Sequence, residues 1–460
     1  MIRYRDFDDL LERMATRSPL QPALLSINSE GAIIQTTWDE LQRLVCARAE
    51  ALASDGRTCE ALLADGTLEC VVEVFSAVRA GVQIALLDPL MPNDVLAPLM
   101  HAIDADCVWA ANKTRQAQLQ QKLGPARAPA FGAHGMLFFT SGTTSFSKAG
   151  LLTDESRMAS AFNGSSLMPL SADDVLLCLL PISHVFGFVC GLLWGLNCGA
   201  TVALGRGTRY YADDLAAFSP TAVAVVPKLL EYLIARNALP QDLRLVRGGA
   251  ADCPDELLDT VRERGIRTSL GYGLTETSSG GALSCGDDVH AMTICPDDEV
   301  AIAENGEILL KAPTCIMQGY YRDTPGPAAS LHNGLLHTGA RGYLDDAGLL
   351  HVQGRMKDVI TLSGGTKLFL PEYEDALARA LDEPDIIVAL FEDKLTLICG
   401  TLAHERSDGE LMKAIEPVMA LYPPASRIAD IARLGHALPR TATGDVERWK
   451  VREEMQHDDC

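Results

Sequence analysis

Residues 138–148 of the chain read Phe138-Phe139-Thr140-Ser141-Gly142-Thr143-Thr144-Ser145-Phe146-Ser147-Lys148. The apolar run 136–139 suits a short buried strand. Residues 140–144 then offer four hydroxyls and several backbone N–H groups, which can surround anionic oxygens. Lys148 adds a mobile positive charge. The stretch therefore predicts a strand followed by a loop that binds phosphate.

This loop differs from the Walker-type nucleotide loop, G-x-x-x-x-G-K-[ST]. Ser147 stands before the lysine, where that motif needs glycine, and Ala149 stands after it, where the motif needs serine or threonine. The pattern therefore argues against a Walker-type NTPase. An ordinary turn is the alternative, because Ser, Thr and Gly dominate turns, and other segments have to decide between the two.

Length and charge set the first limits. A chain of 460 residues is long for a single core, so two or more domains are expected. Lys and Arg total 39 against 61 Asp and Glu, a formal net charge of -22, and no basic run is interleaved with aromatic residues. Nucleic acid is therefore a poor candidate partner. Acidity does not exclude ATP, because phosphate sites are built locally.

Cysteine usage and the chain ends favour a reducing, cytoplasmic compartment. The 13 cysteines show no C-x-x-C spacing, and many lie inside apolar runs, where a thiol packs as a small hydrophobe. Residues 1–6 lead into a charged amphipathic helix instead of an apolar signal segment, and Cys460 is terminal, so no prenylation box is seen. We expect no export signal and no lipid anchor.

The segment 175–205 contains no Asp, Glu, Lys or Arg, and its glycines recur at GxxxG spacing from residue 187 to residue 199. That pattern is compatible with a membrane helix. However, Pro181, Ser183, His184 and Asn197 divide the run into a strand at 176–180, a polar loop, a helix at 185–196 and a strand at 201–204. We therefore expect buried core and no membrane span.

Apolar strand-like runs alternate with amphipathic helices in most of the chain, which is typical of parallel α/β units. Clear examples are the strands 60–63 and 83–87, with the helix 68–80 between them. After residue 339 the strands become shorter and turns more frequent. The C-terminal elements expected are strands at 359–362, 386–391 and 396–401 and helices at 371–381 and 409–422. We place a domain boundary near Lys357, giving domains 1–354 and 355–460.

Four further segments accompany the loop: Pro181-Ile182-Ser183-His184-Val185-Phe186-Gly187, Gly248-Gly249-Ala250-Ala251, Gly271-Tyr272-Gly273-Leu274-Thr275-Glu276 and Gly354-Arg355-Met356-Lys357-Asp358. In this order, the chain resembles the adenylate-forming superfamily of acyl-CoA synthetases, peptide-synthetase adenylation domains and luciferases. The likeness runs from residue 7 to about residue 449. It implies an α/β fold with a large N-terminal domain of βα units in layered sheets and a small, mobile α+β C-terminal domain.

The resemblance also implies a chemistry. In that family a carboxylate attacks the α-phosphate of ATP and pyrophosphate leaves, so negative charge has to be stabilised at both ends of the displacement by fixed donors and a metal ion. By resemblance, Lys148 and the loop hold the β- and γ-phosphates, Thr275 contacts the α-phosphate and Glu276 holds Mg²⁺. The remaining nucleotide contacts implied are Thr140, Ser141, Gly142, Thr143 and Thr144 in the loop, Gly249, Ala250 and Tyr272 around adenine, and Arg355 at the ribose.

Two further features are implied for the acid and for CoA. His184 stands where the family keeps a gate beside the acid pocket, with Phe186, Val225 and Gly273 as wall residues; a core histidine with a satisfied hydrogen bond is the alternative. Residues 363–367, with Gly364 and Gly365, match the glycine loop that lines the pantetheine tunnel after the small domain rotates. A plain turn is the alternative there.

Three positions depart from the family pattern. Asp445 stands where the family has a lysine that bridges the acid and the phosphate, so it should repel both anions. Lys450 is a possible substitute, although five residues along a helix turn it about 140° away. Ala340 replaces the aspartate that grips the ribose hydroxyls. The loop has 145–147 as Ser-Phe-Ser where Gly-x-Pro is usual, which alters its stiffness.

Three functions remain open at this point. The first is an AMP-forming ligase that activates an apolar acid, fatty or aromatic, with Mg-ATP and transfers it to CoA. The second loads the thiol of a carrier-protein phosphopantetheine. The third is a catalytically impaired nucleotide- or acyl-binding homologue, motivated by Asp445 and Ala340. Either a monomer or a homodimer is compatible with the resemblance.

The departure at position 445 gives a direct test. Asp445→Lys restores the positive charge that the family uses in the first half-reaction, so ATP–pyrophosphate exchange should rise, on the order of 10²-fold. Exchange that stays at the level of the unsubstituted protein would instead favour the binding homologue.

Overall fold

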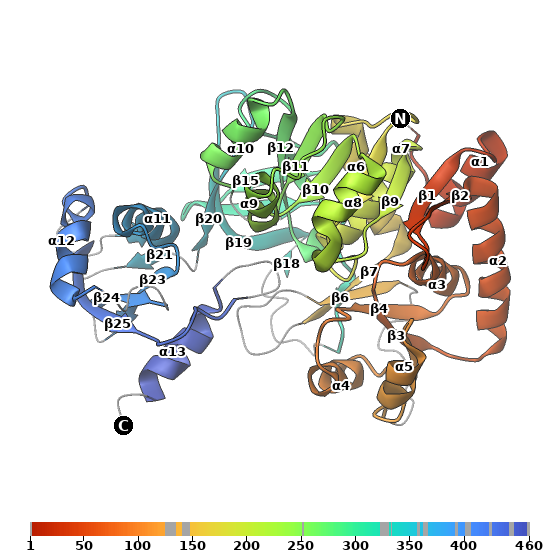
Figure 1. Ribbon diagram of the computed structural model, residues 1–460, viewed down its shortest axis with the longest axis horizontal. Helices are drawn as coiled ribbons and strands as arrows, with labels where there is room; N and C mark the ends of the chain where they lie inside the picture. Colours follow the sequence, from red (N-terminus) through yellow and green to blue (C-terminus); the bar gives the residue numbers. More distant parts are fainter. Residues whose placement is uncertain are drawn as a thin grey trace.

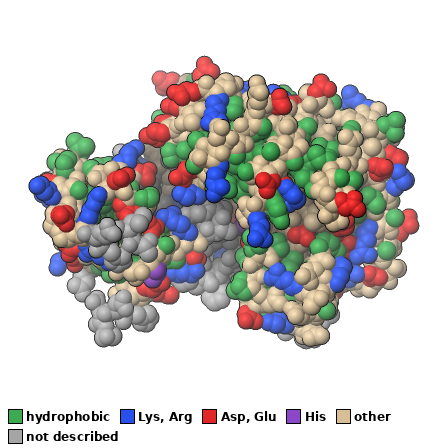
Figure 2. All heavy atoms as spheres, viewed as in Figure 1, with side chains coloured by type: hydrophobic (Ala, Val, Ile, Leu, Met, Phe, Trp, Pro, Cys, Tyr) green, Lys and Arg blue, Asp and Glu red, His purple; other side chains and the backbone are tan. Residues whose placement is uncertain are grey.

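The computed structural model describes residues 2–124, 135–139, 148–250, 253–322, 331–332, 334–356, 359–361, 367–391, 394–400, 406–422, 426–440 and 446–457. Figure 1 shows its helices and strands along the chain. On the face shown in Figure 2, acidic and basic side chains are interspersed over the surface. The described cysteines are all free thiols.

One sheet holds both ends of the loop 140–147. Its strand order is β17-β7-β6-β4-β3-β5. The strands are β3 (Cys59–Leu63), β4 (Gln83–Leu87), β5 (Cys107–Trp109), β6 (Met136–Phe139), β7 (Ala149–Leu152) and β17 (Gly319–Tyr320). β6 is parallel to β4, whereas β7 is antiparallel to β6 and β17 is antiparallel to β7. Phe139 pairs with Ala149, so the strand predicted at 136–139 is confirmed and the ends of the loop lie side by side.

A second sheet of 14 strands has the order β15-β16-β19-β20-β14-β13-β12-β11-β10-β8-β9-β1-β2, with β18 beside β19. The strands are β1 (Pro22–Ile27), β2 (Ile33–Thr37), β8 (Val175–Cys178), β9 (Thr201–Leu204), β10 (Ala222–Val225), β11 (Leu245–Gly248), β12 (Arg267–Gly273), β13 (Gly281–Ser284), β14 (Met292–Ile294), β15 (Glu299–Ile302), β16 (Glu307–Lys311), β18 (Leu331–His332), β19 (Leu335–Leu344) and β20 (Leu350–Arg355).

The strand pairing in this second sheet changes from parallel to antiparallel within β12. Residues 267–270 of β12 pair in parallel with β11, whereas residues 271–273 pair antiparallel with β13. The strands on the parallel side, such as β8, β9 and β10, are almost wholly buried, which explains why they read as continuous apolar runs. The Gly-Tyr-Gly motif therefore begins at the point where the parallel part of the sheet ends.

Helices pack on both sheets and also lie between them (Figure 1). In the N-terminal part they are α1 (Phe7–Arg17), α2 (Trp38–Ser54), α3 (Leu68–Arg79), α4 (Asn93–Ala102), α5 (Lys113–Gln120), α6 (Asp154–Leu167), α7 (Trp194–Cys198), α8 (Tyr211–Phe218), α9 (Pro227–Ala235) and α10 (Asp255–Arg262), with the short helices η1 (Gly187–Leu193), η2 (Thr208–Tyr210) and η3 (Thr275–Thr277). Their starts follow local sequence rules: Thr37 and Glu40 form a capping box at α2, and the Thr67 side chain caps α3.

The segment 175–205 is buried core, as predicted. The helix expected at 185–196 consists of the π-helix η1 followed by the short helix α7. Its glycines let this helix approach the sheet closely: a Cβ atom at Gly191 would lie 3.1 Å from the Cys178 Sγ atom, and one at Gly195 would lie 2.6 Å from a methyl of Val202. Within the described residues, no helix has the length and apolar character needed to cross a membrane.

The C-terminal elements form sheets of their own. They are β21 (Val359–Thr361), β22 (Lys367–Phe369), β23 (Ile386–Phe391), β24 (Lys394–Cys399), β25 (Ile428–Arg433), α11 (Leu370–Leu381), α12 (Asp408–Met419) and α13 (Arg448–His457). β21 pairs with β22, and β23, β24 and β25 form a three-stranded sheet with its own buried cluster. The α+β character expected here is confirmed. The boundary near Lys357 stays a prediction, since that residue lies outside the described part of the chain.

Gly187 should be intolerant of a side chain. A Cβ atom there would lie 2.2 Å from the backbone oxygen of Pro181, so Gly187→Ala should lower the free energy of unfolding by about 1–3 kcal/mol through overpacking. The measurement is urea unfolding, with Gly286→Ala as the matched control. A Cβ atom at Gly286 meets nothing within 4 Å, and this variant should stay within about 0.5 kcal/mol of the parent. Equal midpoints for the two variants would contradict the packing described.

Candidate functional site

The structure brings Lys148, Thr275 and Glu276 together around Tyr320. Lys148 comes directly before β7, and its Nζ atom lies 4.8 Å from the centre of the Tyr320 ring. The Tyr320 hydroxyl donates a hydrogen bond to Oε1 of Glu276 at 2.5 Å. Thr275 lies against β7, since a Cβ atom at Gly150 would be 4.0 Å from its methyl group. The predicted loop contacts Thr140, Ser141, Gly142, Thr143 and Thr144 lie outside the described residues.

Sequence reasoning missed Tyr320. It stands in the run Gly319-Tyr320-Tyr321, which by itself carries no recognisable chemistry. Its role arises because β17 pairs with β7 and so lies beside η3. A backbone contact supports the same arrangement, because the amide of Met317 donates to the carbonyl oxygen of Glu276 at 2.8 Å.

Glu276 fits a magnesium site that is completed by phosphates. Mg²⁺ is usually bound through one or two carboxylates together with substrate oxygens. The part of the chain that the structure describes contains no group of three or more His, Cys, Asp or Glu side chains that could hold a metal by themselves. A single carboxylate beside a predicted phosphate loop therefore matches the partial site that a Mg-nucleotide needs.

The predicted adenine contacts surround the end of β11. Gly249 packs against Phe186, whose ring would lie 2.8 Å from a Cβ atom on that glycine. Ala250 follows with φ of 68°, a left-handed conformation that is uncommon for alanine. Burial raises the pKa of Tyr272 to about 12, against the opposing effects of Thr338 and Arg355.

The pairing of Ala340 shows what surrounds the predicted ribose contact Arg355. Ala340 pairs directly with Arg355 across β19 and β20. Its side chain is only 3% exposed, whereas Arg355 is exposed. Position 340 is therefore the cross-strand neighbour of the arginine, and a methyl group there cannot accept a hydrogen bond from a ribose hydroxyl.

His184 lies between β8 and η1; the residue is half-buried, and its Nε2 atom is buried. Its Nε2 atom has no hydrogen-bond partner among the described residues, which weakens the alternative of a satisfied core histidine. Burial lowers the pKa of His184, and Asp88 partly opposes that effect. The expected wall residues Phe186 and Val225 are close to Gly249, since the Gly249 amide donates to the Val225 carbonyl oxygen at 3.3 Å. The gate role of His184 stays a prediction.

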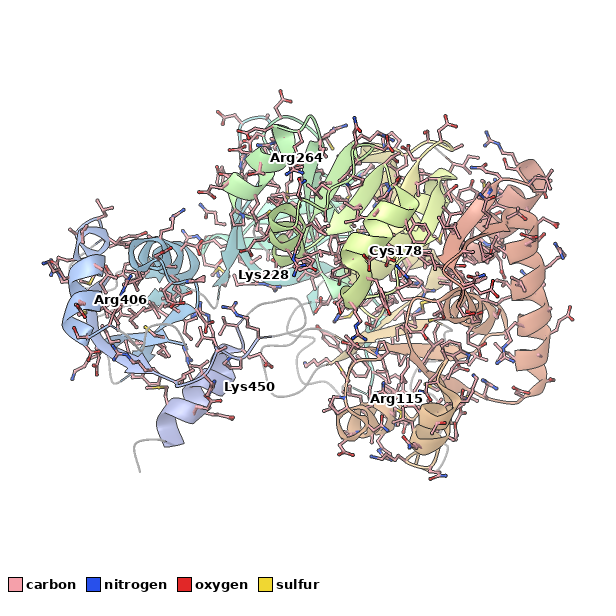
Figure 3. The ribbon with its side chains drawn as sticks, in the orientation of Figure 1. Arg115, Cys178, Lys228, Arg264, Arg406 and Lys450 are labelled. Carbon is pink, nitrogen blue, oxygen red and sulfur yellow. The ribbon has the colours of Figure 1, made fainter. Side chains whose placement is uncertain are left out.

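The remaining predicted residues are in the C-terminal part. Lys450 lies in the first turn of α13 (Figure 3), and its Nζ atom donates to Glu447 at 2.5 Å. Its proposed role as a replacement lysine stays a prediction. Gly364, Gly365 and Asp445 lie outside the described residues.

Comparison with known proteins identifies the family of this chain. A family model described as AMP-binding enzyme matches residues 11–321. The chain belongs to this family of AMP-binding enzymes. The match covers both large sheets up to β17, and it therefore includes Lys148, Glu276 and Tyr320.

Individual relatives agree with this assignment. The chain is 30% identical over 349 residues to an indoleacetate–CoA ligase of Aromatoleum aromaticum, covering 69% of this chain and 66% of that protein. It is 30% identical over 345 residues to a 2-succinylbenzoate–CoA ligase of Bacillus cereus, covering 69% of each. The chain thus matches about two thirds of the length of these relatives.

The fold also agrees with solved AMP-binding enzymes. The o-succinylbenzoate CoA synthetase of Bacillus subtilis, in complex with ATP and a magnesium ion, superposes with a TM-score of 0.78. The alignment covers 96% of this chain and 99% of that one at 24% identity. The α/β fold expected from the motifs, with layered sheets and an additional small sheet region, is therefore confirmed.

The buried imidazole predicts a pH dependence of stability. Below its ordinary pKa of 6.5 the unfolded chain binds a proton at His184 that the folded chain still refuses. The free energy of unfolding should therefore fall as the pH drops from about 8 to about 5, and His184→Gln should remove this component. Urea unfolding of both proteins over that range tests it. If the free energy of unfolding depends on pH in the same way in both proteins, the imidazole titrates equally in the folded and unfolded chains.

Proposed function

We propose that the protein is an AMP-forming ligase that activates a carboxylic acid with Mg-ATP and transfers the acyl group to CoA. The observation that carries the proposal is the grouping of Lys148, Thr275 and Glu276 around Tyr320, on elements of two different sheets. Lys148 is far in sequence from Thr275 and Glu276, and the motif that contains Lys148 is separate from the motif that contains the other two.

In this proposal each side chain has a distinct task. Lys148 stabilises the charge on the phosphates next to the loop, and Thr275 donates to the α-phosphate. Glu276 holds Mg²⁺, which neutralises the departing pyrophosphate. Tyr320 is a positioning residue, because its hydroxyl fixes one oxygen of Glu276 and its ring lies beside the Lys148 ammonium. The nucleotide base would lie next to Tyr272.

The acid is proposed to lie beside His184 and Phe186. The curated relatives described above are named for indoleacetate and 2-succinylbenzoate, which supports an aromatic acid over a fatty acid. Both names specify CoA as the acceptor, which supports CoA over a carrier protein.

We propose further that residues 355–460 act as a lid over this site, with the hinge near Lys357. The separate sheets and separate buried cluster of the C-terminal elements support this division. The free thiols of the described cysteines support a reducing, cytoplasmic location.

A nucleotide- or acyl-binding protein without ligase activity is the second candidate. The buried Ala340, directly opposite Arg355, favours it, because a bound ribose would lack one of its usual anchors. This candidate predicts ATP binding without adenylate formation.

The test is ATP–pyrophosphate exchange with Mg²⁺ over a panel of aromatic, fatty and amino acids, followed by thioester formation with CoA. We expect exchange with at least one aromatic acid. Glu276→Gln should reduce the rate by about 10²-fold, and Tyr320→Phe by about 10-fold because it loses only one hydrogen bond to a charged group. Tyr343→Phe, at an exposed tyrosine on β19, should leave the rate unchanged.

Two outcomes would count against the ligase. The first is a lack of exchange with every acid in protein that is folded by circular dichroism; calorimetric binding of ATP in the same sample would then support the second candidate. The second is exchange that is equally fast in Glu276→Gln, because the site described would not then be the one that works.

A further inference from the structure

A buried arginine, which no carboxylate of the described residues pairs with, lies behind the candidate site. We propose that Arg247 binds a second carboxylate at the far end of the acid, so that the preferred substrate is a dicarboxylic acid. This inference rests on the proposed function, since it assigns the substrate class of the same ligase. Sequence analysis did not single out Arg247, because one arginine before a Gly-Gly turn is unremarkable.

The first argument is the charge of Arg247 and its burial. The residue is 6% exposed, and its Nε atom is buried with no hydrogen-bond partner. In the part of the chain that the structure describes, no carboxylate forms an ion pair with it. Burial of an uncompensated charge is costly. The fully buried Arg157, in contrast, pairs with Asp154 at 3.0 Å, as the usual rule requires.

The second argument is that the neighbours hold the guanidinium in place. Its central carbon lies 5.0 Å from the centre of the Trp194 ring, and the Trp194 indole N–H donates to the Met168 carbonyl oxygen at 3.0 Å, which fixes that ring. Two glycines leave space around the charge: a Cβ atom at Gly164 would lie 3.3 Å from Nη1 and one at Gly271 would lie 3.8 Å from Nε. The group is thus preorganised without being neutralised.

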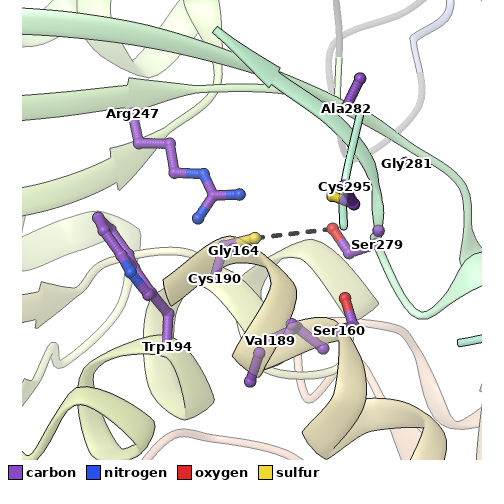
Figure 4. A pocket seen from close by; sticks show the side chains of 12 residues that line it. Ser160, Gly164, Val189, Cys190, Trp194, Arg247, Ser279, Gly281, Ala282 and Cys295 are labelled. Atoms are coloured by element: carbon purple, nitrogen blue, oxygen red, sulfur yellow. Dashed lines mark hydrogen bonds between the residues drawn. The ribbon is translucent and has the colours of Figure 1, made fainter. Parts of the chain in front are cut away.

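The third argument is the cavity that the guanidinium faces. Figure 4 shows the group pointing into this cavity, with Trp194 on one side and Cys295 on the other. Ser160, Cys190 and Ser279 also line it, and no acidic side chain does so among the described residues. The free volume is about 10 Å³, room for about one water-sized group. That space takes one carboxylate oxygen, to which an arginine donates charge-assisted hydrogen bonds.

The fourth argument is that the cavity adjoins the candidate site. The helix η1 contributes Val189 and Cys190 to the cavity, and Phe186, just before η1, packs on Gly249 at the predicted adenine position. On the other side, the carbonyl oxygen of Ser279 would lie 2.3 Å from a Cβ atom on Gly273. An acid whose reacting carboxylate lies near Gly273 could therefore direct its other end toward Arg247.

The experiment compares pairs of acids in ATP–pyrophosphate exchange: a series of aromatic and aliphatic dicarboxylic acids, each beside its monomethyl ester. The unsubstituted protein should show a KM for the best diacid at least ~30-fold below that for its ester. Arg247→Met should raise the KM of the diacid by a similar factor and leave that of the ester unchanged. Arg247→Lys should restore part of the preference, because it keeps the positive charge but not the planar guanidinium.

Arg264→Met is the matched control, because Arg264 is exposed at the end of α10, and it should keep the preference for the diacid. Esters used as well as diacids by the unsubstituted protein would overturn the role of Arg247 and leave the ligase proposal standing. That comparison needs no variant, so poor folding of Arg247→Met cannot obscure it. If no acid supports exchange, the ligase proposal fails. The role of Arg247 is then tested separately by calorimetric binding of the free diacids to the unsubstituted protein and to Arg247→Met. Equal binding to the two proteins, or no binding to either, would overturn that role.

Discussion

The hydrogen bond from Tyr320 to Glu276 joins the two large sheets at the candidate site. Tyr320 belongs to β17, at the edge of the six-stranded sheet, whereas Glu276 follows β12 of the larger sheet. The carboxylate would otherwise be positioned only by the short helix η3. Because the same tyrosine ring lies beside Lys148, one side chain contacts both the ammonium that we propose for phosphate and the carboxylate that we propose for the metal.

Glycines have two different roles around this site. In the family motifs they imply room for a nucleotide or for pantetheine, but the structure gives several of them a packing role. Gly249 accommodates the Phe186 ring, and Gly191 and Gly195 let the helical segment after His184 lie on β8 and β9. These segments are therefore held by close contact between backbone and neighbouring side chains, which an added side chain at these glycines would disrupt.

Ion pairing distinguishes Arg247 from other arginines of this protein. The fully buried Arg157 pairs with Asp154 within α6, and the half-exposed Arg48 of α2 pairs with the buried Glu73 of α3. Arg247 is nearly as buried as Arg157, but no carboxylate among the described residues pairs with it. Since an unpaired charge is unfavourable in a folded interior, its retention is best explained by an anion that comes from outside the chain.

The α/β fold could be predicted from the family resemblance that the ordered motifs carry. The strand before the loop and the buried nature of 175–205 could be predicted from the local pattern of apolar and polar residues. Lys148, Thr275 and Glu276 were likewise found as motif residues. The roles of Tyr320 and Arg247, and the pairing of Ala340 with Arg355, could not be predicted. Each depends on which strands become neighbours and on which charges stay unpaired, and these are properties of contacts between distant segments that only the tertiary structure decides.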